Sequence, residues 1–302
     1  MSERQTGPAA QHQVDGAALA HDQKLQASDN VPPALPPFIK WAGGKRYLAE
    51  QILQVFPRQY GSYFEPFLGG GAVFLALRPG HAYLSDLNGE LIECFSEVRD
   101  NLEEVISELA KLRNSKDDYY RTRSSRPTTT AARAARTIYL VQLAFNGIYR
   151  VHSKTGTFNV PYGRREQRVV YDASHLRCAS RALQSATIEA KDFESATEHA
   201  VERDLVYMDP PYTVAHNHNG FVRYNQRLFD WKDQVRLADC AHQLVRRGCF
   251  VVISNAYHKS IRDLYPDFKR RRIERLSRMA AASAFRRTVL EYVLYSGNCC
   301  DN

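Results

Sequence analysis

Apolar positions along the chain alternate between short runs and helical stripes. Residues 48–56 show the spacing of an amphipathic helix, which Pro57 ends. A short apolar run at 63–67 then leads through three glycines into an apolar helix start at 72–77, and a second run follows at 82–86. A strand, a glycine turn, a helix and a strand at this spacing predict a βαβ unit and therefore a parallel sheet.

Five later apolar runs predict the remaining strands. The first three extend the parallel sheet. The last two follow each other with no helix between them, so we expect an antiparallel hairpin at the sheet edge. The expected fold class is α/β, with a mostly parallel sheet of seven strands. In order, these runs are 187–192, 204–209, 249–254, 268–276 and 288–295.

A different pattern lies between the second and third strands. Residues 90–145 carry apolar stripes at helical spacing, and residues 146–170 have strand-forming residues around a glycine turn, which predicts a β-hairpin. We therefore expect a tail, a sheet domain built from two segments, and a mainly helical insert. The boundaries are 1–37 for the tail, 38–89 and 173–302 for the sheet domain, and 90–172 for the insert.

The composition is that of a globular protein, and its charge favours an anionic partner. With 44% hydrophobic and 25% charged residues, a collagen, a coiled coil or a wholly disordered chain is excluded. The net charge is +8, and Lys and Arg concentrate in two segments, 111–168 and 259–287. A single basic run is usually a solvated face, but two such runs, one beside the expected hairpin, favour a nucleic acid.

Several classes of protein and site are not expected. No apolar run reaches the length of a transmembrane helix, and residues 1–30 lack the apolar region of a signal peptide. The 6 cysteines include no Cys-x-x-Cys pair, so we expect neither a disulfide framework nor a metal site. These features predict a soluble, cytoplasmic protein.

Gly69, Gly70 and Gly71 come directly after one expected strand and before an expected helix. Such a turn lets a ligand approach the backbone closely, and an acid at the end of the next strand, here Asp86, suits a ribose with free hydroxyls. A tight structural turn with a capping acid is the alternative interpretation. The spacing does not match the Gly-x-Gly-x-x-Gly fingerprint of nicotinamide enzymes.

The strongest chemical signal is Asp209-Pro210-Pro211-Tyr212, at the carboxyl end of an expected strand. The prolines fix the backbone, so that the Asp209 carboxylate and the Pro210 carbonyl form two acceptors beside an aromatic ring. An exocyclic amine has two hydrogens with which it can donate hydrogen bonds to these acceptors. Such hydrogen bonds draw the nitrogen toward sp³ and free its lone pair for attack. Tyr212 can stack on the base, as aromatic residues do in base-flipping enzymes.

With these residues in place, the chain resembles the DNA adenine methyltransferase (Dam) family, the α-group of N6-adenine-specific enzymes. The resemblance extends from residue 38 to about residue 295. It implies a Rossmann-like methyltransferase sheet, with the insert as target-recognition domain. It rests on Phe-Ile-Lys-Trp-Ala-Gly-Gly-Lys at 38–45, Glu-Pro-Phe-Leu-Gly-Gly-Gly at 65–71, Phe-Asn-Gly-Ile-Tyr-Arg at 145–150, Phe-Asn-Val-Pro-Tyr-Gly at 158–163 and the tetrapeptide at 209–212.

The resemblance implies S-adenosylmethionine as methyl donor. It also implies that Asp209 binds the target amine by accepting a hydrogen bond from it. Trp41 and Lys45 then line the methionine end, Asp86 binds the ribose, and Asp192 with Phe193 lies near the adenine of the cofactor. The implied cofactor residues are Trp41, Gly43, Gly44, Lys45, Glu65, Pro66, Phe67, Gly69, Gly70, Asp86, Asp192, Phe193 and Asp209. No histidine is required, and His216 and His218 are merely close to the tetrapeptide in sequence.

Residues of the insert take on DNA contacts through the same resemblance. Phe145 corresponds to an aromatic wedge in the double helix, and Lys40 to a residue that contacts guanine. The implied DNA-binding residues are Lys40, Phe145, Asn146, Ile148, Arg150, Asn159, Pro161 and Arg164, a set that favours a GATC-like target in duplex DNA. Arg164, Arg165 and Arg168 suit phosphates, whereas Arg133 and Arg136 are expected on a solvated helix face.

Other functions stay open at this point. An RNA adenine methyltransferase and a non-catalytic DNA-binding protein on the same fold are the alternatives, and transfer to cytosine N4 is chemically close. The 277–283 segment departs from the family's polar loop, which puts the DNA contacts of that loop in question. We expect a monomer, and a restriction endonuclease acting on the same site is a candidate partner.

Overall fold

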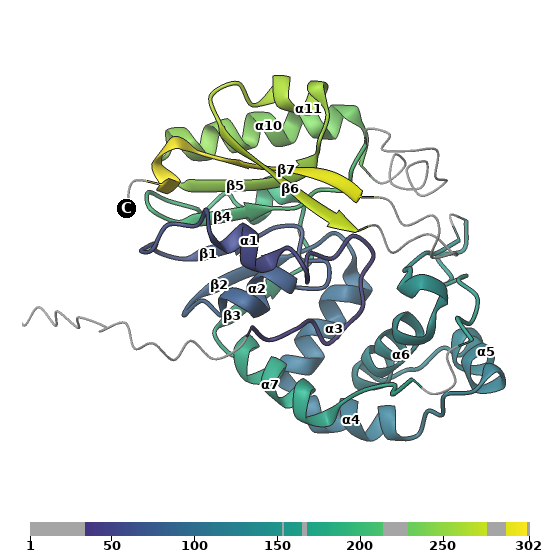
Figure 1. Ribbon diagram of the computed structural model, residues 1–302. Helices are drawn as coiled ribbons and strands as arrows, with labels where there is room; N and C mark the ends of the chain where they lie inside the picture. Colours follow the sequence, from purple (N-terminus) through teal and green to yellow (C-terminus); the bar gives the residue numbers. More distant parts are fainter. Residues whose placement is uncertain (1–33, 153, 165–167, 214–228, 277–287, 301–302) are drawn as a thin grey trace, which may run out of the picture. The chain divides into compact units, whose positions relative to one another are not determined.

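The computed structural model describes residues 34–152, 154–164, 168–213, 229–276 and 288–300 (Figure 1). All contacts given below lie within the compact unit Ala34–Asn302. Within the described residues, seven strands form one sheet in the order β3-β2-β1-β4-β5-β7-β6. The strands are β1 Tyr63–Glu65, β2 Ala82–Ser85, β3 Ala186–Glu189, β4 Leu205–Met208, β5 Phe250–Ala256, β6 Lys269–Leu276 and β7 Thr288–Tyr295.

The pairing confirms the expected fold class. Strands β1 to β5 pair in parallel, whereas β7 is antiparallel to both β5 and β6 and forms the edge hairpin with β6. This is the Rossmann-like arrangement of methyltransferases. β3 ends at Glu189, earlier than the expected strand at 187–192, because Asp192 caps the following short helix α8 Phe193–Ala196.

Helices cover both faces of the sheet, and this explains why its central strands are apolar throughout. In β4, Leu205 and Tyr207 belong to one buried cluster, and Val206 and Met208 belong to a second cluster on the opposite face. The helices outside the insert are α1 Ala49–Leu53, α2 Ala72–Leu77, α7 Ala173–Leu183, α8, α10 Trp231–Arg246, α11 Lys259–Leu264 and the 3-10 turn η3 Gly297–Cys300.

The segment between β2 and β3 is largely helical, as its periodicity predicts. It contains α3 Gly89–Asp100, α4 Leu102–Ala110, α5 Lys116–Ser124, α6 Thr130–Leu143 and the 3-10 turn η1 Phe145–Gly147. Apolar residues of α3 and α6, such as Phe95 and Tyr139, are buried in the same cluster as the α2 face of the sheet. The insert therefore packs directly on the sheet domain.

The expected β-hairpin over 146–170 is present as two arms that pair antiparallel, in an irregular form. Only two isolated antiparallel bridges are present among the described residues there, Ala144 with Tyr162 and Val151 with Phe158. Asn146 and Gly147 have φ of 56° and 63°, which takes the chain out of the extended conformation. Pro161 has no N–H to donate to a ladder. The two arms thus approach each other without forming continuous strands.

Candidate active site

Asp209 is placed by the end of strand β4 at the carboxyl edge of the sheet. β4 is fully buried and lies between β1 and β5 in the centre of the sheet. The loop that follows is held from α10, where Gln234 donates a hydrogen bond to the Pro211 carbonyl at 3.3 Å. Gln234 is itself fully buried and accepts a hydrogen bond from Asn255 of β5 at 3.0 Å. The loop that carries the tetrapeptide at 209–212 is therefore anchored to the core.

Lys45 brings a buried cation to this loop. Its Nζ lies 2.7 Å from Asp209 Oδ1 and 3.6 Å from Glu291 Oε2, and its side chain is 5% exposed. The same Nζ lies 5.0 Å from the centre of the Tyr212 ring. Removing one partner of such a buried pair typically costs about 3–5 kcal/mol, because a charge is then left uncompensated. The sequence predicts Lys45 and Asp209 in one site, and the structure brings them into direct contact.

Glu65 is a second buried acid at the same edge, at the end of β1. The Tyr63 hydroxyl and the Phe74 backbone N–H both donate to its Oε2, at 2.7 and 3.0 Å. Burial, reinforced by the negative charge of Asp209, raises the pKa of Glu65 to about 8, despite the opposing effect of these hydrogen bonds. Glu65 is therefore protonated at neutral pH. A cationic ligand beside it favours its ionised form.

The glycine turn after β1 is shaped around Trp41. Gly69 and Gly71 have φ of 49° and 65°, in the left-handed region. A Cβ at Gly69 would lie 3.1 Å from Trp41 Cδ1, and a Cβ at Gly70 would lie 3.2 Å from Trp41 Cβ. A side chain at either position would displace the indole. The first motif and the cofactor motif therefore meet, as the resemblance implies.

Asp86 follows β2 and holds this turn. Its Oδ2 accepts a hydrogen bond from Gly69 N–H and its Oδ1 from Asn88 N–H, both at 3.0 Å. Burial raises the pKa of Asp86, although these backbone hydrogen bonds oppose the rise. The structural role that the sequence left as an alternative is thus present, at the carboxyl edge where a ribose is expected.

Phe193 lies in an aromatic cluster next to the glycine turn. Its ring stacks on Phe67 with centroids 5.5 Å apart, and Phe67 belongs to the segment that leads into the turn. Arg236 of α10 lies over the Phe193 ring at 4.9 Å and pairs with Asp192 at 3.0 Å. Sequence reasoning missed Arg236, because a lone arginine on an amphipathic helix carries no local signal.

The expected DNA contacts form a connected group around η1. Lys40 packs against Gly147 so closely that a Cβ there would lie 2.2 Å from Lys40 Cδ. Arg150 Nε donates to Asn159 Oδ1 at 2.8 Å, which couples two of the expected reading side chains. Phe145, the expected wedge, is 44% exposed and its N–H donates to the Pro161 carbonyl at 2.9 Å. Arg164 and Pro161 are exposed, whereas Ile148 is partly buried.

Two further residues near these sites were not singled out from the sequence. Tyr149 stacks on Trp41 with centroids 5.0 Å apart and donates its hydroxyl to Glu90 Oε2 at 2.8 Å. The segment at 145–150 therefore contacts the first motif, at 38–45. Glu291, a single acid in the apolar strand β7, is fully buried beside Tyr212. A charged residue at an inward strand position was the signal available.

The expectation of a solvated helix face is wrong for Arg136. Arg136 is 9% exposed and donates to the carbonyls of Thr122 and Arg123, at the end of α5, at 3.1 and 2.8 Å. Burial lowers the pKa of its guanidinium. Arg133 is partly exposed as expected and forms a two-pronged ion pair with Glu93.

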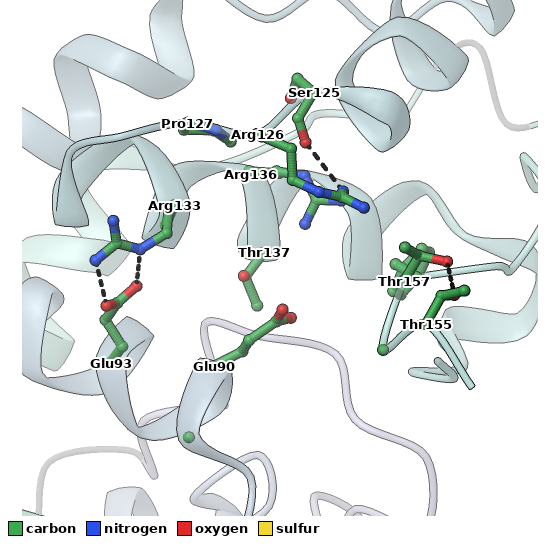
Figure 2. A pocket seen from close by; sticks show the side chains of 13 residues that line it. Glu90, Glu93, Ser125, Arg126, Pro127, Arg133, Arg136, Thr137, Thr155 and Thr157 are labelled. Carbon is green, nitrogen blue, oxygen red and sulfur yellow. Dashed lines mark hydrogen bonds and ion pairs between the residues drawn. The ribbon is translucent and has the colours of Figure 1, made fainter. Parts of the chain in front are cut away.

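These arginines line a cavity of about 350 Å³ in the insert (Figure 2). Figure 2 shows the Arg133 guanidinium joined to the Glu93 carboxylate, with Arg136 and Glu90 among the other side chains that line the cavity. No residue expected in the active site or on the DNA-reading surface lines it. Of its charged groups, Arg133 pairs with Glu93, Arg136 donates to the carbonyls of Thr122 and Arg123, and Glu90 accepts from the Tyr149 hydroxyl.

Some predictions concern residues outside the described ranges. His216, His218, Arg165 and the 277–283 segment lie there. Within the described part of the chain, no group of three or more His, Cys, Asp or Glu residues is arranged to hold a metal ion. Nor does any helix in that part have the length and apolar character needed to cross a membrane.

Comparisons with known proteins identify the family of this chain. The family model of D12 class N6 adenine-specific DNA methyltransferases matches residues 41–279. The Type II methyltransferase M1.LlaDCHI of Lactococcus lactis subsp. cremoris is 39% identical over 270 residues, which cover 86% of this chain and 95% of that protein. The DNA adenine methylase of Haemophilus influenzae is 33% identical over 249 residues, covering 79% and 86%. That of Escherichia coli K12 is 31% identical over 224 residues, covering 72% and 80%.

The chain belongs to the D12 class of N6 adenine-specific DNA methyltransferases. It is an adenine-specific DNA methyltransferase, and the resemblance drawn from the motifs is confirmed. Family membership disfavours an RNA substrate and cytosine N4 as the target. An enzyme of this family requires a methyl donor and acts on DNA.

Proposed function

We propose that the protein transfers a methyl group from S-adenosylmethionine to the N6 amine of an adenine flipped out of duplex DNA. The observation that carries this proposal is the arrangement at the end of β4. There the Asp209 carboxylate, paired with Lys45 at 2.7 Å, follows a buried strand and is joined through two prolines to the Tyr212 ring. Two acceptors beside an aromatic face suit an exocyclic amine on a planar base.

The chemistry follows from what these groups do to the amine. The N6 lone pair of adenine is delocalised into the ring, and hydrogen bonds from N6 to Asp209 and the Pro210 carbonyl draw it back to nitrogen. S-adenosylmethionine supplies an electrophilic methyl group on a sulfonium whose sulfur leaves without protonation. The nitrogen–methyl bond forms as the sulfur–methyl bond breaks. One amine proton then leaves, and Asp209 is placed to accept it.

The residues around the glycine turn fit such a cofactor. A Cβ at Gly69 or Gly70 would lie 3.1 or 3.2 Å from Trp41, so glycine at these positions lets Trp41 pack closely on the turn. We assign Asp86 to the ribose, and Glu65 with Lys45 and Trp41 to the methionine end. A carboxyl group of raised pKa at that end suits a ligand that carries an ammonium and a sulfonium, because the ligand stabilises its ionised form. Asp192 and Phe193 take the adenine end.

The group around η1 supports a GATC-like target. Lys40 and Arg150 match guanine O6 and N7, and apolar atoms of Ile148 and Pro161 match the thymine methyl. Phe145, the exposed ring, fills the space that the flipped base leaves. Arg164 contacts phosphate. In this assignment residues 90–172 recognise the target, and residues 38–89 with 173–302 carry out the transfer.

The test is methyl transfer from radiolabelled S-adenosylmethionine to methylation-free genomic DNA, followed by base-resolution mapping of modified adenines. We expect label in one short motif of GATC type. Label spread over unrelated adenines contradicts the target assignment, and label in structured RNA alone contradicts the proposed DNA substrate.

Two relatives are named Type II methyltransferases. On that basis a restriction endonuclease acting on the same site is a candidate partner, and we assign the enzyme as a monomer.

A further inference from the structure

Strand β7 carries one acid, Glu291, in an otherwise apolar and uncharged sequence. Glu291 pairs in register with Ala256 of β5 and with Ile273 of β6, and it is fully buried. A buried carboxylate is costly unless charged or hydrogen-bonding partners compensate it. Contacts with charged or hydrogen-bonding groups must therefore compensate the burial of Glu291 in the centre of the antiparallel hairpin.

Those contacts lead into the active site. The Tyr212 hydroxyl donates a hydrogen bond to Glu291 Oε2 at 2.8 Å, and Lys45 Nζ lies 3.6 Å from the same oxygen. The three residues come from β7, from the loop after β4 and from the turn before α1. One carboxylate thus contacts both the aromatic ring and the cation that flank Asp209.

The geometry gives each contact a consequence for the target base. A tyrosine ring turns about two side-chain bonds, and a hydrogen bond at its far end fixes the plane on which a base stacks. Burial, with the charges of Glu291 and Asp209, holds the pKa of Tyr212 well above its usual value, so its hydroxyl remains a donor. Lys45 has to stay in place while Asp209 accepts the amine, and Glu291 gives the ammonium a second anion.

We propose that Glu291 is a positioning residue for adenine methylation, which fixes the Tyr212 ring through its hydroxyl and holds Lys45 beside Asp209. This inference rests on the proposed roles of Asp209 and Tyr212. Glu291 acts through these residues and contacts neither the base nor the cofactor. It explains why the β6–β7 hairpin carries a buried acid on the strand next to β5.

The test compares Glu291→Gln, Tyr212→Phe and the double variant in single-turnover methylation. Tyr212→Phe keeps the ring and removes only its hydroxyl. The matched control is Glu274→Gln, an acid on the neighbouring strand β6 whose side chain is 57% exposed. DNA containing 2-aminopurine at the target adenine reports the environment of the flipped base, and a titration with S-adenosylmethionine reports the cofactor site.

We expect each single variant to slow the single-turnover rate by about 10- to 100-fold, the effect of one hydrogen bond to a charged group. The 2-aminopurine signal of the complex changes in both variants. In Tyr212→Phe the cofactor affinity stays within about twofold of the wild type, because Tyr212 is assigned no cofactor contact, whereas Glu291→Gln also weakens cofactor binding through Lys45, which is assigned to the methionine end. In Glu291→Gln the amide oxygen can still accept from the Tyr212 hydroxyl but carries no charge. Adding Tyr212→Phe to this variant therefore slows it by a smaller factor than Tyr212→Phe slows the wild type, since the charge that strengthens the shared hydrogen bond is already gone.

The inference is overturned if Glu291→Gln behaves like Glu274→Gln in rate and fluorescence, or if the two losses multiply in the double variant. Should Glu291→Gln fail to fold, Tyr212→Phe alone decides, because it alters no buried charge, and a wild-type rate and signal there refute the proposal. Asp209→Ala distinguishes a failure of the proposed function from a failure of the inference on Glu291. Retained transfer in that variant contradicts the proposed function itself, whereas its loss together with a wild-type Glu291→Gln contradicts only this inference.

Discussion

Glu65 allows a quantitative test of the electrostatics at this site. Its carboxyl is 2% exposed, and its pKa lies at about 8 in the folded protein against an ordinary 4.5. A folded state that binds the proton more tightly than the unfolded chain loses stability as the pH rises. The loss begins near the unfolded pKa and is complete above the folded one, so the window is pH 4.5 to 8.

The magnitude follows from the interval between the two pKa values. At 1.36 kcal/mol per pH unit, ionisation of Glu65 lowers the unfolding free energy by about 5 kcal/mol between pH 4.5 and 8. Glu65→Gln replaces the protonated carboxyl by a neutral group of the same shape. Its amide oxygen can still accept the hydrogen bonds from Tyr63 and Phe74 that the wild-type Oε2 accepts. The variant lacks the ionisation and therefore lacks this pH dependence.

The assay is urea denaturation of the cofactor-free wild type and of Glu65→Gln at pH 5 and at pH 8. We expect similar stabilities at pH 5, and at pH 8 a variant that is more stable than the wild type by about 3–5 kcal/mol. The difference between the two proteins cancels every other titrating group. If the unfolding free energies of the two proteins change with pH by the same amount, the assignment of a protonated Glu65 is refuted. A variant that is less stable than the wild type at both pH values shows instead that the amide does not fit the site.

Three further predictions test separate parts of the site. Asp209→Ala abolishes methyl transfer while the cofactor affinity remains largely intact, which calorimetric titration beside the transfer assay checks; retained activity contradicts the role of Asp209. Gly147→Ala forces Lys40 aside, since a Cβ at position 147 would lie 2.2 Å from Lys40 Cδ. We expect about 10-fold weaker discrimination at the base assigned to Lys40 and no change in cofactor affinity, measured with DNA substrates altered at single positions and by cofactor titration. Arg136→Met removes two hydrogen bonds that cap α5 and lowers the unfolding free energy by about 2–3 kcal/mol, read from urea midpoints; an unchanged midpoint shows that the cap is unimportant.

Much of this architecture could be predicted from local sequence. The segments at 63–67, 72–77 and 82–86 coincide closely with β1, α2 and β2, because a short apolar run, a glycine turn and a second run leave few alternatives. Asp209 follows the buried β4 as expected. The two prolines and the residues that flank them are consecutive in sequence, so one short motif predicts their chemistry.

Other features depend on which strands become neighbours. Lys45, Asp209 and Glu291 are far apart in sequence and meet only because β4 and β7 flank β5 and because the turn before α1 reaches the same edge. Tyr149 stacks on Trp41 for a similar reason, since the insert folds back onto the sheet domain. Apolar periodicity records how much of each element is buried, but not which element lies opposite.

The correction at Arg136 and the irregular form of the expected hairpin have the same origin. Arg136 looks like a surface residue in a helical repeat, yet α5 folds over it and supplies the carbonyls that its guanidinium requires. The hairpin over 146–170 has strand-forming residues, yet the left-handed Asn146 and Gly147 suit contact with Lys40 better than a regular ladder. The sequence by itself determined the fold class and the family, and it predicted the tetrapeptide at 209–212 as the catalytic residues. Only the tertiary structure decided which charges neutralise one another, because that depends on distances between elements that no local pattern specifies.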